Sequence, residues 1–379
     1  MQKKLITLAL ASAFAVPAFA ATSNVDIYGQ FDVSYSYVDG INSNPAPTGV
    51  STSANRVDSN VSRIGLKGSE DLGDGLAAIW QWEQGINLDA GAESSGKTAF
   101  GTQRDTFVGL KGGFGTVLGG THNTPYKDGT GSLDPFADEA GDYNAIIGTF
   151  EGYNTSDLRL GNVLAYVTPT FSGLTAAVAT SFLKETGMDN HGNTPSAYTG
   201  TVMYANGPLF ADVGYEQAND VGTTIGLSDV TIKSWKVGAG YTLDALTVNA
   251  LYDHIELDNR LPGGGSVDRG AWGLNGVYNI GNIGLKLGFY DAMDVSGNNV
   301  NGSNTGAKLY EGGVDYNLSK RTKLYAVYAR TANDANATYC VGGGQDAGFG
   351  GSGLNSGNVC STTPGQAESI FSLGMRHAF

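Results

Sequence analysis

Residues 366–379 read Q-A-E-S-I-F-S-L-G-M-R-H-A-F, and this stretch decides the fold. Its apolar side chains recur at every second position, as in an extended strand with one apolar and one polar face. Such a strand at the end of the sequence leaves an edge that needs a partner. Residues 25–38, V-D-I-Y-G-Q-F-D-V-S-Y-S-Y-V, alternate in the same way and predict that partner. Pairing of the first strand with the last would close a barrel.

Alternating segments of similar length fill the rest of the sequence, separated by short and long connections in turn. Counting them predicts an all-β fold, a 16-stranded antiparallel transmembrane β-barrel with short periplasmic turns and long external loops. The fourteen segments between the first and last strands are 60–69, 76–84, 103–110, 114–120, 158–168, 174–183, 197–205, 209–218, 231–241, 246–256, 269–278, 283–291, 307–316 and 323–331.

The composition agrees with strands and tight turns, since the chain has 57 Gly and 19 Tyr but 5 Met, and 15% of its residues are charged. After residue 21 no apolar run is long enough for a membrane-spanning helix, so a membrane location requires strands. Lys236 and Lys286 lie on the polar faces of their strands. A lysine facing lipid at the midplane costs about 2–4 kcal/mol, so these faces should line a water-filled interior.

The first twenty residues have the pattern of an export signal. Lys3 and Lys4 are followed by an apolar run over residues 5–16 and by the A-x-A site of residues 18–20. We therefore predict a signal peptide over residues 1–20, which is removed, and a single barrel domain over residues 21–379.

Two cysteines, Cys340 and Cys360, lie in a loop-like stretch rich in Gly, Ser and Asn. In an exported protein a disulfide between them is the favoured interpretation. The alternative, a pair of free or metal-bound thiols, lacks a histidine nearby.

Charge and motifs exclude several functions. The net charge of −14 and the absence of a basic stripe argue against a nucleic-acid partner. The four histidines are scattered, and no nucleophile elbow or metal spacing surrounds them. We expect no enzyme activity, no cofactor and no metal, although a barrel hydrolase with a site at its rim stays open.

Sixteen strands enclose more space than side chains can fill, so an aqueous channel is expected. The long connection 121–157 could fold inward and narrow it, or could be an ordinary solvated external loop. It carries acids at Asp128, Asp134, Asp138, Glu139 and Asp142. Nearby strands place basic side chains on their polar faces, and a facing acidic loop would create a transverse field. These basic residues are Arg63, Lys67, Arg104 and Arg159.

Five stretches resemble one family. They are V-D-I-Y-G-Q-F-D at residue 25, S-R-I-G-L-K-G-S-E-D-L-G-D-G at 62, T-F-V-G-L-K-G-G-F-G-T-V at 106, T-P-T-F-S-G-L at 168 and G-M-R-H-A-F at 374. Together they resemble the general diffusion porins of Gram-negative outer membranes, in their beta-proteobacterial branch. The resemblance implies an integral outer-membrane protein, a homotrimer, and a third loop folded into each pore.

On that pattern Arg63, Arg104 and Arg159 look like the basic wall of the constriction, and the acids of residues 134–142 look like its loop side. The family's P-E-F-G-G loop pattern is absent, and this chain has L-D-P-F-A-D-E instead. The resemblance also implies contact with outer-membrane lipid and lipopolysaccharide, and it implies that Phe379 is an assembly signal for the insertion machinery.

The sequence therefore predicts a porin through which ions and small hydrophilic solutes diffuse passively. Two alternatives stay open: a channel selective for sugars or organic acids, and a surface barrel for adhesion or immune recognition.

Overall fold

The computed structural model describes residues 24–41, 52–89, 98–183, 196–219, 230–261, 265–297, 302–341 and 363–379. The predicted signal peptide, residues 1–20, lies outside the described residues. Among the described residues, no helix is both long and apolar enough to cross a membrane. The elements are β1 (Asn24–Ile41), β2 (Thr52–Ser59), β3 (Arg63–Gly73), β4 (Leu76–Ile86), β5 (Phe100–Gln103), β6 (Thr106–Gly112), β7 (Gly115–Asn123), α2 (Pro125–Thr130), η1 (Gly131–Leu133), η2 (Tyr143–Ala145), β8 (Thr149–Phe150), β9 (Tyr153–Asn154), β10 (Arg159–Val167), β11 (Leu174–Phe182), β12 (Ser196–Asn206), β13 (Leu209–Asn219), β14 (Thr231–Leu243), β15 (Leu246–Leu261), β16 (Gly265–Ile280), β17 (Ile283–Ala292), β18 (Ser296–Gly297), β19 (Ala307–Asn317), β20 (Thr322–Asn333) and β21 (Glu368–Ala378).

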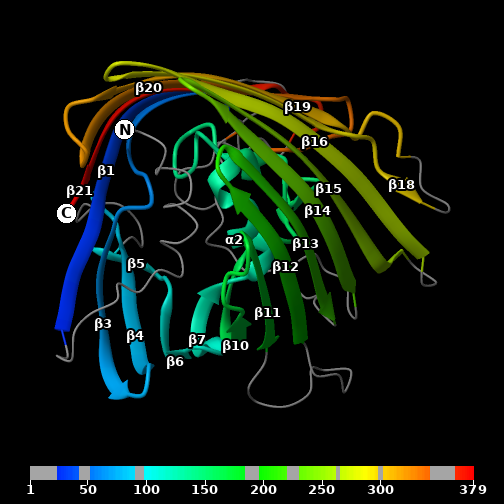
Figure 1. Ribbon diagram of the computed structural model, residues 1–379. Coiled ribbons are helices and arrows are strands. Elements are labelled where there is room, and N and C mark those ends of the chain that lie inside the picture. Colours follow the sequence, from blue (N-terminus) through cyan, green and yellow to red (C-terminus); the bar gives the residue numbers. More distant parts are fainter. Residues whose placement is uncertain are drawn as a thin grey trace.

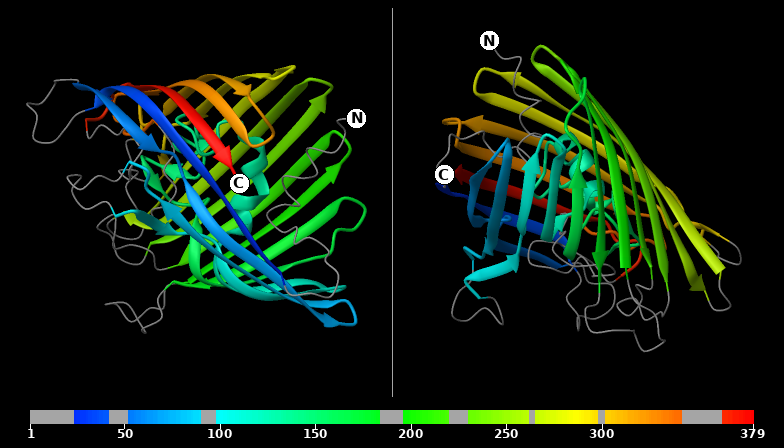
Figure 2. Two further views of the ribbon diagram at one scale, coloured as in Figure 1. Left: turned by 90° about the vertical axis from the view of Figure 1, so that its left-hand side faces the viewer. Right: turned by 60° about the horizontal axis from the view of Figure 1, so that its bottom comes forward.

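The strands form one antiparallel sheet that closes on itself (Figures 1 and 2). On one side β1 pairs with β21, from Gln30 opposite Ala378 to Asp39 opposite Ser369. On its other side β1 pairs with β2 and β3. Since β2 with β3 and β5 with β6 each continue one barrel strand, sixteen strands make up the wall. The predicted barrel and the predicted pairing of its first and last strands are both confirmed.

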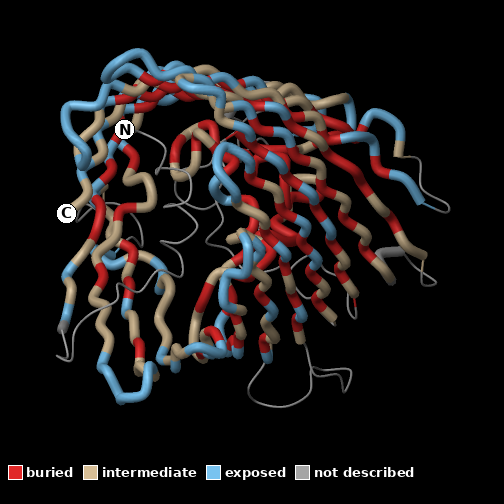
Figure 3. The backbone as a smooth tube through the Cα atoms, in the orientation of Figure 1, coloured by how far each residue is buried: buried red, intermediate tan, exposed pale blue. Residues whose placement is uncertain are grey.

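Side chains alternate between the two faces of the wall, as the period of two predicts. Along β1, Val33 and Tyr35 are exposed on the outside, whereas Asp32 and Ser34 are buried on the inside. The same alternation of buried and exposed positions runs along most strands in Figure 3. Lys236 and Lys286 both lie on the inner side and are buried. The apolar outer face fits lipid, and the charged inner face is shielded from it.

The second barrel strand differs from the prediction. Instead of one strand over residues 60–69, β2 and β3 are separated at residues 60–62, where Val61 has a φ of +51°. The Ser62 hydroxyl accepts a hydrogen bond from the Asp32 amide at 2.9 Å and donates to the Asp32 carbonyl at 2.9 Å. A side chain thus replaces the strand ladder at this break, a substitution that alternation of apolar residues does not reveal.

Short connections lie at one rim of the barrel. The turn between β3 and β4 is an example, because Gly73, Asp74 and Gly75 all have positive φ values of 89°, 52° and 75°. Glycine adopts such angles without steric cost, which explains the G-D-G sequence of this turn. The opposite rim carries longer connections, and residues 124–158 are the one that the structure describes in full.

Loop 3 is the name we give to residues 124–158, which join β7 to β10. It begins with α2, whose N-cap Thr124 accepts a hydrogen bond from the Lys127 amide, and Pro125 follows the cap. The helix lies inside the curve of the wall (Figure 1) and contacts β12 and β13. The fit is close, since a Cβ atom on Gly129 would lie 2.5 Å from an Asp212 carboxylate oxygen. The predicted connection 121–157 thus starts slightly later, because β7 extends to Asn123.

Candidate functional site

Loop 3 is attached to the inner wall along its whole length. Wall side chains bond its backbone at Leu133, Pro135, Ile146 and Gly148, so several contacts fix these parts of the loop on either side of its tip. Asn249 and Asn275 donate to the Leu133 carbonyl, Lys286 donates to the Pro135 carbonyl, and Arg269 donates to the Ile146 carbonyl. The Asp253 carboxylate accepts from the Gly148 amide.

Apolar packing holds the same loop. Tyr143, Ile146 and Ile147 of loop 3 are buried in one cluster with Leu251 and Leu309 of the wall. Burying one such side chain contributes about 1.5–3 kcal/mol, so the cluster stabilises the loop substantially. Loop 3 is therefore a packed part of the barrel interior.

Arg63 lies at the start of β3 and faces loop 3. Its Nη1 atom is 3.0 Å from an oxygen of Asp138, and its Nε atom is 4.0 Å from an oxygen of Glu83. Lys67 follows on the same strand, with its Nζ atom 5.0 Å from the centre of the Tyr28 ring. Arg63 thus links the wall to loop 3, whereas Lys67 packs on the wall.

Arg104 and Arg159 lie on the wall near Arg63. The Arg104 Nε atom is 2.5 Å from Glu83, the same carboxylate that Arg63 approaches. The Arg159 Nε atom is 2.7 Å from Asp105, the residue that follows Arg104. The structure thus brings the three predicted arginines together, and each of them pairs with a carboxylate.

Asp138 and Glu139 form the tip of loop 3. Glu139 lies 2.6 Å from Lys286 and 2.5 Å from Lys323. Burial opposes ionisation of both acids, but Arg63 beside Asp138 and Lys286 beside Glu139 hold each pKa below its ordinary value. Both carboxylates are therefore charged at neutral pH.

The other acids of loop 3 serve the loop itself. The Asp134 carboxylate accepts hydrogen bonds from the amides of Phe136 and Tyr143, at 2.8 and 3.0 Å. Asp128 accepts from the Asn123 side chain at 2.9 Å, and Asp142 caps η2. Burial raises the pKa of Asp128 and of Asp134, and raises that of Asp142 to about 6. These three carboxylates thus have structural partners within or next to the loop.

The sequence prediction missed several charged residues of this site. They lie on the inward-facing positions of strands or next to the arginines, so the alternation pattern could have located them but not their partners. The missed residues are Glu83, Asp105, Asp315 and Lys323.

Two other predicted features lie elsewhere. Cys340 is buried, and Cys360 lies outside the described residues, so the pairing of these two residues stays a prediction. Phe379 meets β1, where its amide and carbonyl bond the carbonyl and amide of Gly29 at 3.1 and 3.2 Å. Its ring lies 5.2 Å from that of Phe31 on the outer face.

Comparison with known families decides the classification of this barrel. Residues 7–336 match the model of the Gram-negative porin family. The chain belongs to the Gram-negative porins. It is accordingly an integral protein of the outer membrane, and this porin's relatives are channels rather than enzymes.

Similar proteins match along nearly the full length of this porin. Outer membrane porin protein 32 of Delftia acidovorans is 28% identical over 385 residues, covering 100% of both chains. Major outer membrane protein P.IB of Neisseria meningitidis is 31% identical and covers 85% of this chain and 91% of its own. Among solved structures, the anion-selective porin from Comamonas acidovorans superposes with a TM-score of 0.75 at 26% identity, covering 94% of this chain and 100% of that chain.

Proposed function

We propose that this porin is a water-filled channel for passive diffusion of ions and small hydrophilic solutes, narrowed by loop 3. The observation that carries the proposal is the Arg63–Asp138 pair, which joins the wall to the loop tip. Its two side chains are 23% and 30% exposed, whereas the Glu139 side chain is 1% exposed. The pair therefore borders the open part of the lumen, where a passing solute would meet it.

The charges at this constriction are largely balanced. Arg63 faces Asp138, Arg104 faces Glu83, and Arg159 faces Asp105. The solved relative from Comamonas acidovorans is named an anion-selective porin. For this chain we propose a basic wall whose field is reduced by its carboxylates, so that any preference for anions is modest. Of the loop acids, Asp138 and Glu139 belong to the constriction in this proposal.

We further propose that the porin is a homotrimer. A structural neighbour, OmpT of Vibrio cholerae, is described in a trimer form.

Conductance of the purified protein in a planar bilayer tests the proposal. We expect stable openings that appear in groups of three equal steps, because three barrels insert together. Single steps would contradict the trimer, and the absence of any conductance by folded protein would contradict the channel.

Replacing Arg63, Arg104 and Arg159 together with glutamine tests the basic wall. The change removes the arginine partners of Glu83, Asp105 and Asp138 and leaves their negative charges, so we expect the anion-to-cation permeability ratio to fall by roughly tenfold. Reversal potentials in a salt gradient measure this ratio. Lys308→Gln on the outer face of β19 is the matched control and should keep the wild-type ratio. An unchanged ratio in the triple variant would mean that these arginines do not govern charge preference.

A further inference from the structure

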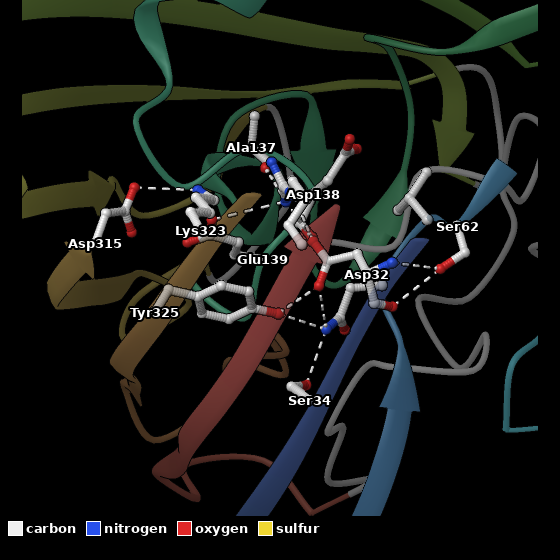
Figure 4. A network of polar contacts seen from close by, with 12 residues as sticks. Asp32, Ser34, Ser62, Ala137, Asp138, Glu139, Asp315, Lys323 and Tyr325 are labelled. Carbon is white, nitrogen blue, oxygen red and sulfur yellow. Dashed lines mark hydrogen bonds and ion pairs between the residues drawn. The ribbon is translucent and has the colours of Figure 1, made fainter. Parts of the chain in front are cut away.

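A buried polar network crosses the seam where the last strand meets the first (Figure 4). Asp32 of β1 lies directly opposite Arg376 of β21. The Asp32 carboxylate is fully buried; it accepts hydrogen bonds from the Arg376 Nε atom at 2.5 Å and from the Tyr325 hydroxyl at 2.6 Å. Three neighbouring strands, β20, β21 and β1, thus meet at one carboxylate.

The same guanidinium group also reaches loop 3. The Arg376 Nη2 atom donates to the carbonyls of Ala137 and Asp138, each at 3.3 Å, and lies 3.7 Å from a Glu139 oxygen. Its Nε side therefore faces the seam while its Nη2 side faces the loop. Arginine suits this position because its planar group presents several donors in fixed directions, which a lysine ammonium does not.

The backbone at the tip of loop 3 has an unfavourable conformation that other contacts must stabilise. Asp138 has a φ of +64°, a left-handed conformation that is uncommon for a residue other than glycine. Lys286 and Lys323 hold the neighbouring Glu139 through its side chain, whereas Arg376 holds the carbonyls of the two peptides that flank the Asp138 Cα atom. This backbone geometry accompanies the placement of the Asp138 carboxylate 3.0 Å from Arg63.

We propose that Arg376 is a positioning residue that links closure of the barrel to construction of the constriction. By anchoring the loop backbone to the seam, it keeps Asp138 directed at Arg63 and so determines the charge that a solute meets. The constriction is then complete only after β21 has paired with β1. This inference rests on the proposed channel function and names the residue that tunes its charge preference.

The test compares Arg376→Lys, Arg376→Gln and the control Arg330→Gln, which alters an exposed arginine of the adjacent strand β20. Permeability ratios are measured in bilayers. Arg376→Lys keeps the positive charge but loses the planar group with its several donors. If Arg376 acts by position, Arg376→Lys should change the anion-to-cation permeability ratio about twofold, as Arg376→Gln should also do. Arg330→Gln should match the wild type. A wild-type ratio for Arg376→Lys would overturn the proposal, even where Arg376→Gln differs, because charge alone would then suffice.

Two further measurements test the positioning role of Arg376 separately from the proposed channel function. Adding Asp138→Asn to Arg376→Lys should change the ratio less than Asp138→Asn does alone, because residues that act as a unit are not additive. Amide hydrogen exchange over residues 136–142 should speed up in Arg376→Lys, and this readout does not depend on conduction. If the folded wild type did not conduct, the channel proposal would fail, but unchanged exchange is what would refute the positioning role.

If Arg376 variants do not fold, Asp32→Asn offers a second route, since it keeps the arginine and removes the negative charge of its seam partner. We expect faster exchange over the same loop residues. Wild-type exchange in folded Asp32→Asn protein would show that the seam does not hold the loop.

Discussion

Deletion of Phe379 is expected to reduce the amount of folded porin in the outer membrane by roughly tenfold, the ratio that corresponds to about 1.4 kcal/mol. The residue provides the final backbone hydrogen bonds of the seam, to Gly29. Its ring also covers Gly29, since a Cβ atom there would lie 2.5 Å from it, and it packs 5.2 Å from Phe31. Each of these contacts is absent until the barrel closes.

The conductance of the copies that do insert should equal that of the wild type, because the Phe379 ring packs against Phe31 on the outer face, whereas the charges of the proposed constriction lie on the inner face. Heat-resistant oligomer in membrane extracts measures assembly, and bilayer recordings measure conductance. Phe379→Tyr keeps the ring and should assemble normally, and Leu318→Ala removes an exposed apolar residue from a short turn as a control. Normal assembly of the truncated chain would refute the role of Phe379.

Glu139→Gln is expected to produce the largest change in the channel itself. The carboxylate is buried and balances Lys286 and Lys323, so glutamine leaves two lysines with Asp315 as their remaining acid. Breaking a buried charge pair by removing one partner costs about 3–5 kcal/mol. We expect the loop tip to leave the wall, with a lower unfolding temperature and larger, noisier openings.

Calorimetry and single-channel recording measure the two effects. Asp138→Asn is the informative comparison, because its more exposed carboxylate should alter ion preference with a smaller loss of stability. Glu70→Gln, an exposed position on β3, is the control for loss of charge. A wild-type unfolding temperature and wild-type noise in Glu139→Gln would show that Glu139 does not hold the loop.

The faces of the strands were predictable, and the partners of their charges were not. Alternation placed Lys236 and Lys286 on the inner side, and the structure agrees. The same pattern could not show that Asp134 bonds the loop backbone whereas Asp138 meets Arg63, because both acids lie in one irregular segment without a period. It also missed the break at residues 60–62, where Ser62 bonds Asp32 in place of the strand ladder.

The sequence by itself determined the barrel: the number of strands, their outer and inner faces, and the pairing of the last strand with the first. The number of strands and their faces depend on residues one or two positions apart, and the two-residue period of a strand records them directly. The pairing of the last strand with the first follows because each strand would otherwise leave an unpaired edge. The tertiary structure alone decided which charges meet. Glu139 and Lys323 are 184 positions apart, and they meet because wall residues from distant strands hold loop 3. Such contacts depend on the closed barrel, and no local pattern encodes them.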